Sequence, residues 1–403
     1  MKDPRTEDAM SKPILHVDER IFMLDCARKY LTPSWIKRLI DEICAVGYNV
    51  LQIHFGEEMG HRLESKRFPW LAGADHSLCV FDTAHGMPEN DGKYITQDEM
   101  RDIVLHAQSR GIEVIPSFDS PGHMNYAVKK YNAHYGKDIS NYFHKDGKTH
   151  IVSGSSIHKE LSAISYSRGI DISNPEAVAF AKELYTEYGI FFRELGCKSF
   201  DMGGDELLGF GDSVDNSIPK WHNLEHWEEY AKSITANPEA VAYDAFVLYM
   251  NDIATLLYSL GYESVRMWND DVYRYADTGW REVVKIDKSI DVQYWTHITN
   301  DSKNTAAFYI EKGHNVYNFA APYSYYTLYP NKAPTHKTPK EIEDEWNPYV
   351  FDDVNPENVI EFPNKKVKGA GFCLWTDTPD KESEDEMLEN MRPYFTAFVK
   401  KAL

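Results

Sequence analysis

Residues 198–206 read Lys-Ser-Phe-Asp-Met-Gly-Gly-Asp-Glu, and both the predicted fold and the predicted chemistry depend on this stretch. The apolar positions up to Met202 predict a short strand, and the two glycines allow a sharp turn after it. Asp205 and Glu206 then stand where the strand ends, as the catalytic groups of many α/β enzymes do. If the turn brings both carboxylates into one cleft, proximity raises the pKa of one of them and leaves a proton donor beside an anion. Alone, these four residues are more often a solvated acidic turn, so the rest of the chain decides.

A strand followed by a polar residue recurs along the chain. Strands are predicted at residues 20–25, 48–55 and 112–116, in a short run that contains Phe200 and Met202, and at residues 265–268, 290–295, 316–319 and 371–375. Helices intervene in most gaps, with start signals at Thr32-Pro33, at a capping box opened by Thr96, and at Asn174-Pro175. This alternation implies parallel strands, and eight units predict an α/β fold, the (β/α)8 TIM barrel. A doubly wound open sheet is the alternative, but its glycine-rich fingerprint is absent.

The chain is expected to form one catalytic barrel domain. We place this domain at residues 20–403, after an irregular lead-in at residues 1–19, because no repeat or linker-like stretch interrupts it. Four long segments are predicted to be loops: 56–95, 119–172, 207–240 and 320–365. Each follows a strand, so the four would gather on the face of the barrel that carries active sites.

Composition excludes several classes of partner and hints at one. The net charge of −20 argues against nucleic acid and against anionic membrane surfaces, and no apolar run is long enough to span a bilayer. The N-terminus opens polar without an apolar signal region, so a cytoplasmic location is expected, although a trimmed secreted form would look the same. The five cysteines are widely spaced and predict buried thiols. Nine Trp and 26 Tyr are more than a core needs and suggest carbohydrate as the ligand, since aromatic faces stack on sugar rings.

Every predicted strand exit carries a polar or tryptophan side chain. These residues are Asp25 and Arg28, His54, Asp119 and His123, Asp205 and Glu206, Trp268 with Asn269 and Asp270, Trp295, Tyr323 and Tyr325, and Trp375 with Asp377. Any one of them alone is more often a core aromatic, a rim ion pair or a buried support group than a ligand contact. All of them together are hard to explain as packing, and they indicate an active site.

The sequence resembles glycoside hydrolase family 20, the β-N-acetylhexosaminidases, and within it the single-domain dispersin type. The resembling stretches are Met23–Arg28, Leu51–Phe55, Ile115–Met124, Gly203–Glu206, Arg266–Asp270 and Leu374-Trp375. They occur in the family's order and span nearly the whole chain from residue 20 onward. The resemblance implies the same barrel that strand and helix alternation predicts.

The family's chemistry assigns a role to each matching residue. The resemblance implies substrate-assisted, retaining hydrolysis, in which the substrate's own acetamido oxygen attacks the anomeric carbon and no metal or organic cofactor is required. Glu206 would be the general acid and base, and Asp205 would orient the acetamido N–H. The substrate contacts would be Arg28, Trp268, Trp295, Tyr325, Trp375 and Asp377. The register of Tyr325 is open because tyrosines neighbour it, and His54, Asp119 and His123 would be buried support.

Three departures from the family pattern leave the substrate open. Asp201 stands where the family usually has His, Ser117 where it has Glu, and Asp377 where it has the longer Glu. The expected activity is exo-hydrolysis of terminal β-linked GlcNAc or GalNAc by a monomer or homodimer. A lacto-N-biosidase and a dispersin-like poly-β-1,6-GlcNAc hydrolase are alternatives within the class. From other classes, a metal-dependent barrel hydrolase using His54, Asp119, His123 and Asp205, and a non-catalytic sugar-binding barrel, also stay open.

Overall fold

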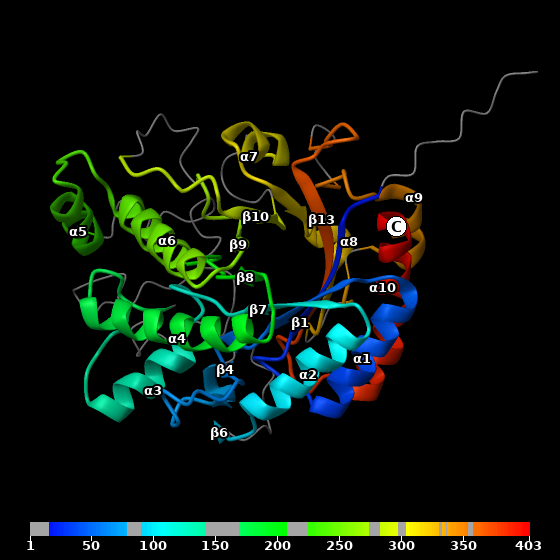
Figure 1. The fold of residues 1–403 in the computed structure, drawn as a ribbon, viewed down its shortest axis with the longest axis horizontal. Helices are drawn as coiled ribbons and strands as arrows, with labels where there is room; N and C mark the ends of the chain where they lie inside the picture. Colours follow the sequence, from blue (N-terminus) through cyan, green and yellow to red (C-terminus); the bar gives the residue numbers. More distant parts are fainter. Residues whose placement is uncertain are drawn as a thin grey trace, which may run out of the picture.

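Eight parallel strands close into a barrel, which confirms the predicted (β/α)8 fold. The computed structural model of the chain describes residues 16–78, 90–141, 169–207, 225–273, 283–296, 304–329, 333–335, 337–353 and 358–403. The barrel strands, in order around the sheet, are β1 (Glu19–Asp25), β2 (Val50–His54), β7 (Glu113–Ser117), β8 (Ser199–Asp201), β9 (Ser264–Trp268), β10 (Asp291–Tyr294), β11 (Val316–Asn318) and β13 (Val367–Trp375). β1 pairs with β13, so the first and last strands lie side by side (Figure 1).

The alternation of side chains along each strand builds two separate cores. In β1, Phe22 and Leu24 point outward into the large core between the strands and the surrounding helices. Ile21 and Met23 point inward into a smaller cluster that fills the barrel interior. The inner cluster rises through Trp268 to partly buried aromatics at the strand exits. Packing of the barrel interior therefore ends in an aromatic layer.

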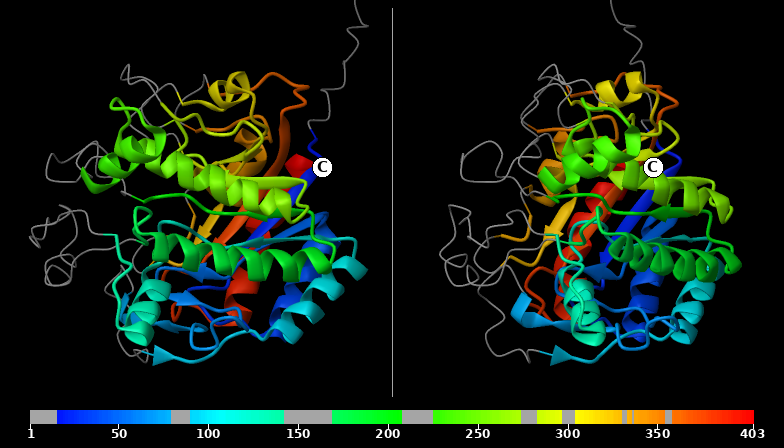
Figure 2. Two further views of the ribbon diagram at one scale, coloured as in Figure 1. Left: turned by 60° about the vertical axis from the view of Figure 1, so that its left-hand side comes forward. Right: turned by 90° about the vertical axis from the view of Figure 1, so that its left-hand side faces the viewer.

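Helices cover the outside of the barrel (Figure 2). The larger connecting helices are α1 (Pro33–Val46), α2 (Gln97–Ser109), α4 (Pro175–Glu194), α6 (Ala242–Ser259), α7 (Ala306–Lys312) and α10 (Glu384–Ala402). Five of them begin at a side-chain cap whose oxygen accepts a backbone N–H: Thr32, Thr96, Asn174, Thr305 and Ser383. Among the described residues, none of the helices is long and apolar enough to cross a bilayer. Cys26, Cys197 and Cys373 are buried free thiols, Cys44 is partly buried, and Cys79 lies outside the described residues.

The long segments predicted to be loops contain further elements. Residues 56–95 fold into a small antiparallel sheet of β3 (Gly56–Glu57), β4 (Gly60–His61), β5 (Gly73–Asp75) and β6 (Asn90–Asp91), with a 3-10 turn at His76–Leu78. The other segments hold α3 (Asn125–Tyr135), α5 (Glu225–Thr235), α8 (Ala321–Ser324), β12 (Tyr325–Thr327) and α9 (Pro339–Glu345). β12 pairs in parallel with the end of β13. The helix α3 has no side-chain cap and the short strands form through tertiary contacts, so local patterns did not indicate them. The helix α9 begins at a capping box of Thr338 and Glu341, a signal that sequence analysis missed.

Candidate active site

The Gly-Gly turn after β8 places the two adjacent carboxylates at the strand exit. Gly203 and Gly204 have φ of +70° and +89°, a region that side chains disfavour. A Cβ on Gly203 would lie 1.9 Å from Asp119 Oδ1, so only glycine fits there. Glu206 itself has φ of +44°, and its backbone N–H donates to Asp270 Oδ2 at 2.7 Å. The backbone of the turn is thus strained, and a hydrogen bond to Asp270 at the exit of the neighbouring strand stabilises it.

A cavity of about 310 Å³ opens above this turn. Its lining includes nine of the predicted site residues, with His123 among them as a predicted support residue: Arg28, His123, Asp205, Glu206, Trp268, Trp295, Tyr325, Trp375 and Asp377. Glu57, Thr296, Ala321, Pro322, Thr327, Tyr329, Phe351 and Asp352 complete it. The sequence therefore predicted the residues of one shared cavity from separate strand exits. His54 and Asp119 are fully or almost fully buried and stand behind this lining.

Aromatic rings form one side of the cavity. The rings of Trp295 and Tyr325 are nearly parallel, with centroids 6.1 Å apart. Trp375 is tilted against both Tyr325 and Trp268, with centroid distances of 5.8 and 6.1 Å. The indole of Trp295 donates to Asp270 Oδ1 at 3.1 Å, which fixes the orientation of the ring. This arrangement provides flat apolar faces beside the carboxylate pair, as sugar binding requires.

Arg28 also lines the cavity, where carboxylates surround it and its guanidinium carbon lies 5.5 Å from the centroid of the Trp375 ring. Its Nη1 donates to Asp25 at 3.0 Å, its Nη2 lies 2.9 Å from Glu57 Oε1, and its Nε donates to Glu58 at 3.0 Å. Asp377 lies near this group, and burial raises the pKa of its carboxyl to about 7 against the opposing charge of Arg28. Arg28 is thus fixed in position, and a carboxyl that changes charge near neutral pH stands next to it.

His123 connects this acidic group to the catalytic turn. Its Nδ1 lies 2.9 Å from Glu57 Oε2 and 3.1 Å from Glu58 Oε2, and its Nε2 lies 3.4 Å from Glu206 Oε2. Burial opposes its charge, but the Glu57 carboxylate and hydrogen bonds to Glu206, Glu57 and Glu58 hold the pKa of His123 well above its ordinary value. His123 is therefore a cation that faces Glu206.

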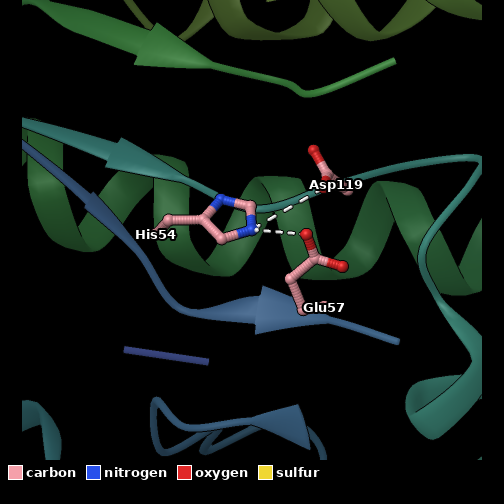
Figure 3. Close-up of side chains that lie close together, drawn as sticks. All are labelled: His54, Glu57 and Asp119. Carbon is pink, nitrogen blue, oxygen red and sulfur yellow. Dashed lines mark ion pairs between the residues drawn. The ribbon is translucent and has the colours of Figure 1, made fainter. Parts of the chain in front are cut away.

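His54, Glu57 and Asp119 meet behind His123 (Figure 3). His54 Nε2 lies 3.4 Å from Glu57 Oε1 and 3.6 Å from Asp119 Oδ2, and its Nδ1 lies 2.8 Å from the hydroxyl of Ser117. Burial, together with the charges of Asp205 and Glu57, raises the pKa of the Asp119 carboxyl well above its ordinary value. Asp119 therefore tends to hold a proton.

The Asp205–Glu206 pair also favours a bound proton. Burial raises the pKa of the Asp205 carboxyl well above its ordinary value, and His123 opposes this while the charges of Asp270, Glu57 and Glu206 add to it. Asp205 therefore holds a proton more readily than an exposed aspartate does. General-acid catalysis needs a carboxyl that carries a proton beside the reacting group.

Several of these groups have the spacing that a metal ion requires. They are His54–Glu57–Asp119, Glu57–Glu58–His123 and Asp119–His123–Asp205. In the first two groups Glu57 already contacts the cationic guanidinium of Arg28, and in the other His123 is itself the cation. Protein cations thus compensate these carboxylates.

Sequence reasoning missed Glu57, Glu58 and Asp270 as contacts of the predicted site residues. The pair Glu57-Glu58 follows the exit of β2, and Asp270 follows that of β9. The only signal in the sequence was the presence of acidic residues after these strand ends. The partners they contact are set by how the short sheet β3–β6 and the turn after β9 fold back over the barrel.

The fold and site define a class of protein. Residues 19–390 match glycosyl hydrolase family 20, catalytic domain, and the chain belongs to this family. The match covers the barrel and every predicted site residue.

Named relatives and solved structures agree with this assignment. The chain is 29% identical over 315 residues to the lacto-N-biosidase of Bifidobacterium bifidum, covering 74% of this chain and 23% of that protein. It is 26% identical over 289 residues to β-hexosaminidase subunit A2 of Dictyostelium discoideum, covering 72% and 42%. The chain thus spans less than half the length of these two relatives. The Dispersin B structure shares the fold with a TM-score of 0.66 at 23% identity, covering 95% of this chain and 98% of that one.

Proposed function

We propose that this chain is a β-N-acetylhexosaminidase that releases terminal β-linked GlcNAc or GalNAc with retention of configuration. The observation that carries the proposal is the Asp205–Glu206 pair, which opens into a cavity that aromatic faces and Arg28 also line. Family membership and relatives named β-hexosaminidase support the reaction class.

In the proposed mechanism, the substrate supplies its own nucleophile. The acetamido oxygen attacks the anomeric carbon while Glu206 gives its proton to the leaving oxygen, and an oxazolinium-type intermediate forms. Glu206 then takes a proton from water, which opens the intermediate. Asp205 accepts the acetamido N–H and stabilises the positive charge that develops there. His123, held as a cation 3.4 Å from Glu206, stabilises the carboxylate after proton transfer.

The remaining lining residues position the sugar in this proposal. Trp268, Trp295 and Trp375 enclose the acetamido group and support the ring, and Tyr325 donates its hydroxyl to the acetamido oxygen. Arg28 and Asp377 contact the outer sugar hydroxyls. His54 and Asp119 do not line the cavity and are support groups.

A disaccharide-releasing activity is the second candidate. The cavity lining also includes Thr296, Phe351 and Asp352, side chains that the contacts proposed for a single N-acetylhexosamine do not use. The 29% identical relative is a lacto-N-biosidase.

Parallel hydrolysis of aryl β-GlcNAc, β-GalNAc and β-lacto-N-biose separates these activities. We expect turnover of a monosaccharide substrate, inhibition by a thiazoline that mimics the cyclised acetamido group, and full activity after exhaustive chelation. Turnover of the disaccharide alone would establish the biosidase instead. Activity lost on chelation and restored by a metal would overturn the proposed mechanism, and thiazoline binding without turnover of any substrate would indicate a sugar-binding barrel.

A further inference from the structure

Three buried residues from neighbouring strands form a hydrogen-bonded row inside the barrel. His54 ends β2, Ser117 ends β7 and Asp201 ends β8, and the strand register places His54 beside Ser117 and Ser117 beside Asp201. All three side chains are fully buried. The proposed catalytic roles use neither Ser117 nor Asp201.

Donors surround the Asp201 carboxylate. Its Oδ2 accepts from Ser117 Oγ at 2.6 Å and from Gln52 at 3.0 Å, and its Oδ1 accepts from Gln293 at 2.9 Å and from the Gly203 N–H at 3.3 Å. Four donors favour the ionised carboxylate, and burial raises its pKa only to about 6. At neutral pH Asp201 is therefore the acceptor, and the hydroxyl proton of Ser117 points to it.

This assignment settles which nitrogen of His54 carries a hydrogen. Ser117 has only one hydroxyl proton, and it is already donated, so the contact of 2.8 Å with His54 Nδ1 requires a hydrogen on Nδ1. In neutral His54 the other nitrogen, Nε2, is then a bare acceptor. It faces Glu57 Oε1 and Asp119 Oδ2, which are acceptors too. Three acceptors that face one another in a buried site repel unless a proton lies among them.

We propose that Asp201 and Ser117 are positioning residues that fix His54 as its Nδ1–H form and thereby retain one proton between His54 Nε2 and the Asp119 carboxyl. Glu57 is not the holder of this proton, because the charges of Arg28 and His123 outweigh its burial and lower the pKa of its carboxyl well below the ordinary range. The groups that face His54 are Glu57 from β3, Asp119 after β7 and, through Ser117, Asp201 from β8; His61 from β4 interacts with it electrostatically.

The retained proton influences the protonation of Asp205 and Glu206 through a short series of contacts. Glu57 presents one oxygen to His54 and the other to His123, whose second nitrogen faces Glu206. Asp119 and Asp205 are close enough for their charges to interact. Loss of the proton would add a negative charge behind Asp205 and Glu206 and make the acid harder to deprotonate. The row therefore sets the pH range in which the site holds its catalytic proton.

The test compares the wild type with Ser117→Ala, Ser117→Thr and Ser120→Ala. Ser120 is a matched control, since it is equally buried and bonds two tyrosine hydroxyls outside the row. The first readout is the ¹⁵N chemical shift pattern of His54 in the labelled protein, which requires no activity. We expect a protonated Nδ1 in the wild type, in Ser117→Thr and in Ser120→Ala, and an Nε2–H form in Ser117→Ala, where Nε2 can donate to the carboxylates.

The second readout is the pH profile of aryl-glycoside hydrolysis. This readout depends on the proposed function, whereas the NMR readout does not. In Ser117→Ala the Nε2–H donates to Asp119 and lets it ionise, so the basic limb of kcat/KM should move up by about half a pH unit or more. KM should stay near the wild-type value, and Ser117→Thr should restore the profile. An Nε2–H form in the wild type, or zinc binding that displaces the proton from His54, would overturn the proposal. If the His54 spectrum of Ser117→Ala changes but its pH profile does not move, the link between His54 and catalysis is overturned. If the spectra are as expected but the wild type hydrolyses no substrate, the result counts against the proposed function and not against the assigned form of His54.

Discussion

The carboxylate of Asp270 joins Glu206 to Trp295 across neighbouring strand exits. One oxygen accepts the Glu206 backbone N–H at 2.7 Å, and the other accepts the Trp295 indole N–H at 3.1 Å. Glu206 has a left-handed backbone at φ of +44°, a conformation that needs support from its surroundings. Asp270 therefore fixes the proposed acid relative to the aromatic wall.

Replacing Asp270 by Asn removes one of its two acceptor oxygens. We expect Asp270→Asn to lower kcat by about tenfold or more, because the amide offers one acceptor oxygen to two donors and leaves a buried N–H unpaired, which costs about 1–3 kcal/mol. Asp291→Asn is the control: Asp291 is equally buried and accepts hydrogen bonds from Ser264 and Asn315 at the start of β10. Equal losses of kcat in the two variants, measured by steady-state kinetics, would show a general packing effect instead.

The close approach of Asp119 to the Gly-Gly turn predicts a selective effect of added side chains. Gly203→Ala would place a methyl group against Asp119, in addition to the cost of its positive φ. Gly111→Ala has nearly the same φ, +73°, and nothing within 4 Å of the added Cβ. We expect Gly111→Ala to lose about 1–2 kcal/mol of unfolding free energy from backbone strain alone. Gly203→Ala should lose more unfolding free energy than this and should also lose activity. Equal losses in the two variants, measured by urea unfolding and steady-state kinetics, would contradict this account.

The pocket tyrosine can be identified with adjacent variants. Tyr325 lines the cavity, whereas the hydroxyl of Tyr326 bonds Glu382 on the other side of β12. We expect Tyr325→Phe to weaken thiazoline binding and to lower kcat/KM by about 10- to 100-fold, since it removes the hydroxyl proposed to position the acetamido oxygen for attack. Tyr326→Phe should leave both unchanged. The reverse pattern, measured by inhibition constants and kinetics, would shift the register by one residue.

Burial of Asp377 predicts a pH-dependent penalty on stability. Its folded pKa of about 7 lies above the ordinary value, so the folded state binds its proton more tightly than the unfolded state does. Its contribution to stability is therefore full below pH 4 and is lost as the pH rises towards 7. Relative to the wild type, Asp377→Asn should gain up to about 1.4 kcal/mol of unfolding free energy per pH unit across this window. The change is read from urea unfolding at several pH values, with the 81% exposed Asp385→Asn as control. A difference that stays constant from pH 4 to pH 8 would contradict the assigned burial effect.

Local chemistry explains which parts of the fold could be predicted from the sequence. Capped helices such as α1 and α2 were predicted because Thr32 and Thr96 hydrogen-bond within their own first turns. The helix α3 was not, since its first residue follows Met124, which has no capping side chain. The two-residue strands β3 and β4 exist only through their pairing with each other and with β5.

The same distinction applies to the site. Residues such as Trp268 and Trp375 end barrel strands, so the strand pattern alone brings them to one face. Contacts between strands are different, because Ser117 and Asp201 are 84 positions apart and meet only through the register of β7 and β8. For Glu57 and Glu58, the sequence indicated an acidic position but not the contact with Arg28 and His123.

Hydrolysis by Glu206→Gln with two leaving groups tests the central claim most directly. We would compare kcat/KM for a dinitrophenyl β-GlcNAc, whose leaving group needs no proton, with that for the unsubstituted phenyl glycoside, whose leaving group does. If Glu206 is the general acid, the variant should lose about a hundredfold to ten-thousandfold on the phenyl glycoside and far less on the dinitrophenyl glycoside. Equal losses on both substrates, or no loss on the phenyl glycoside, would contradict the assignment of Glu206.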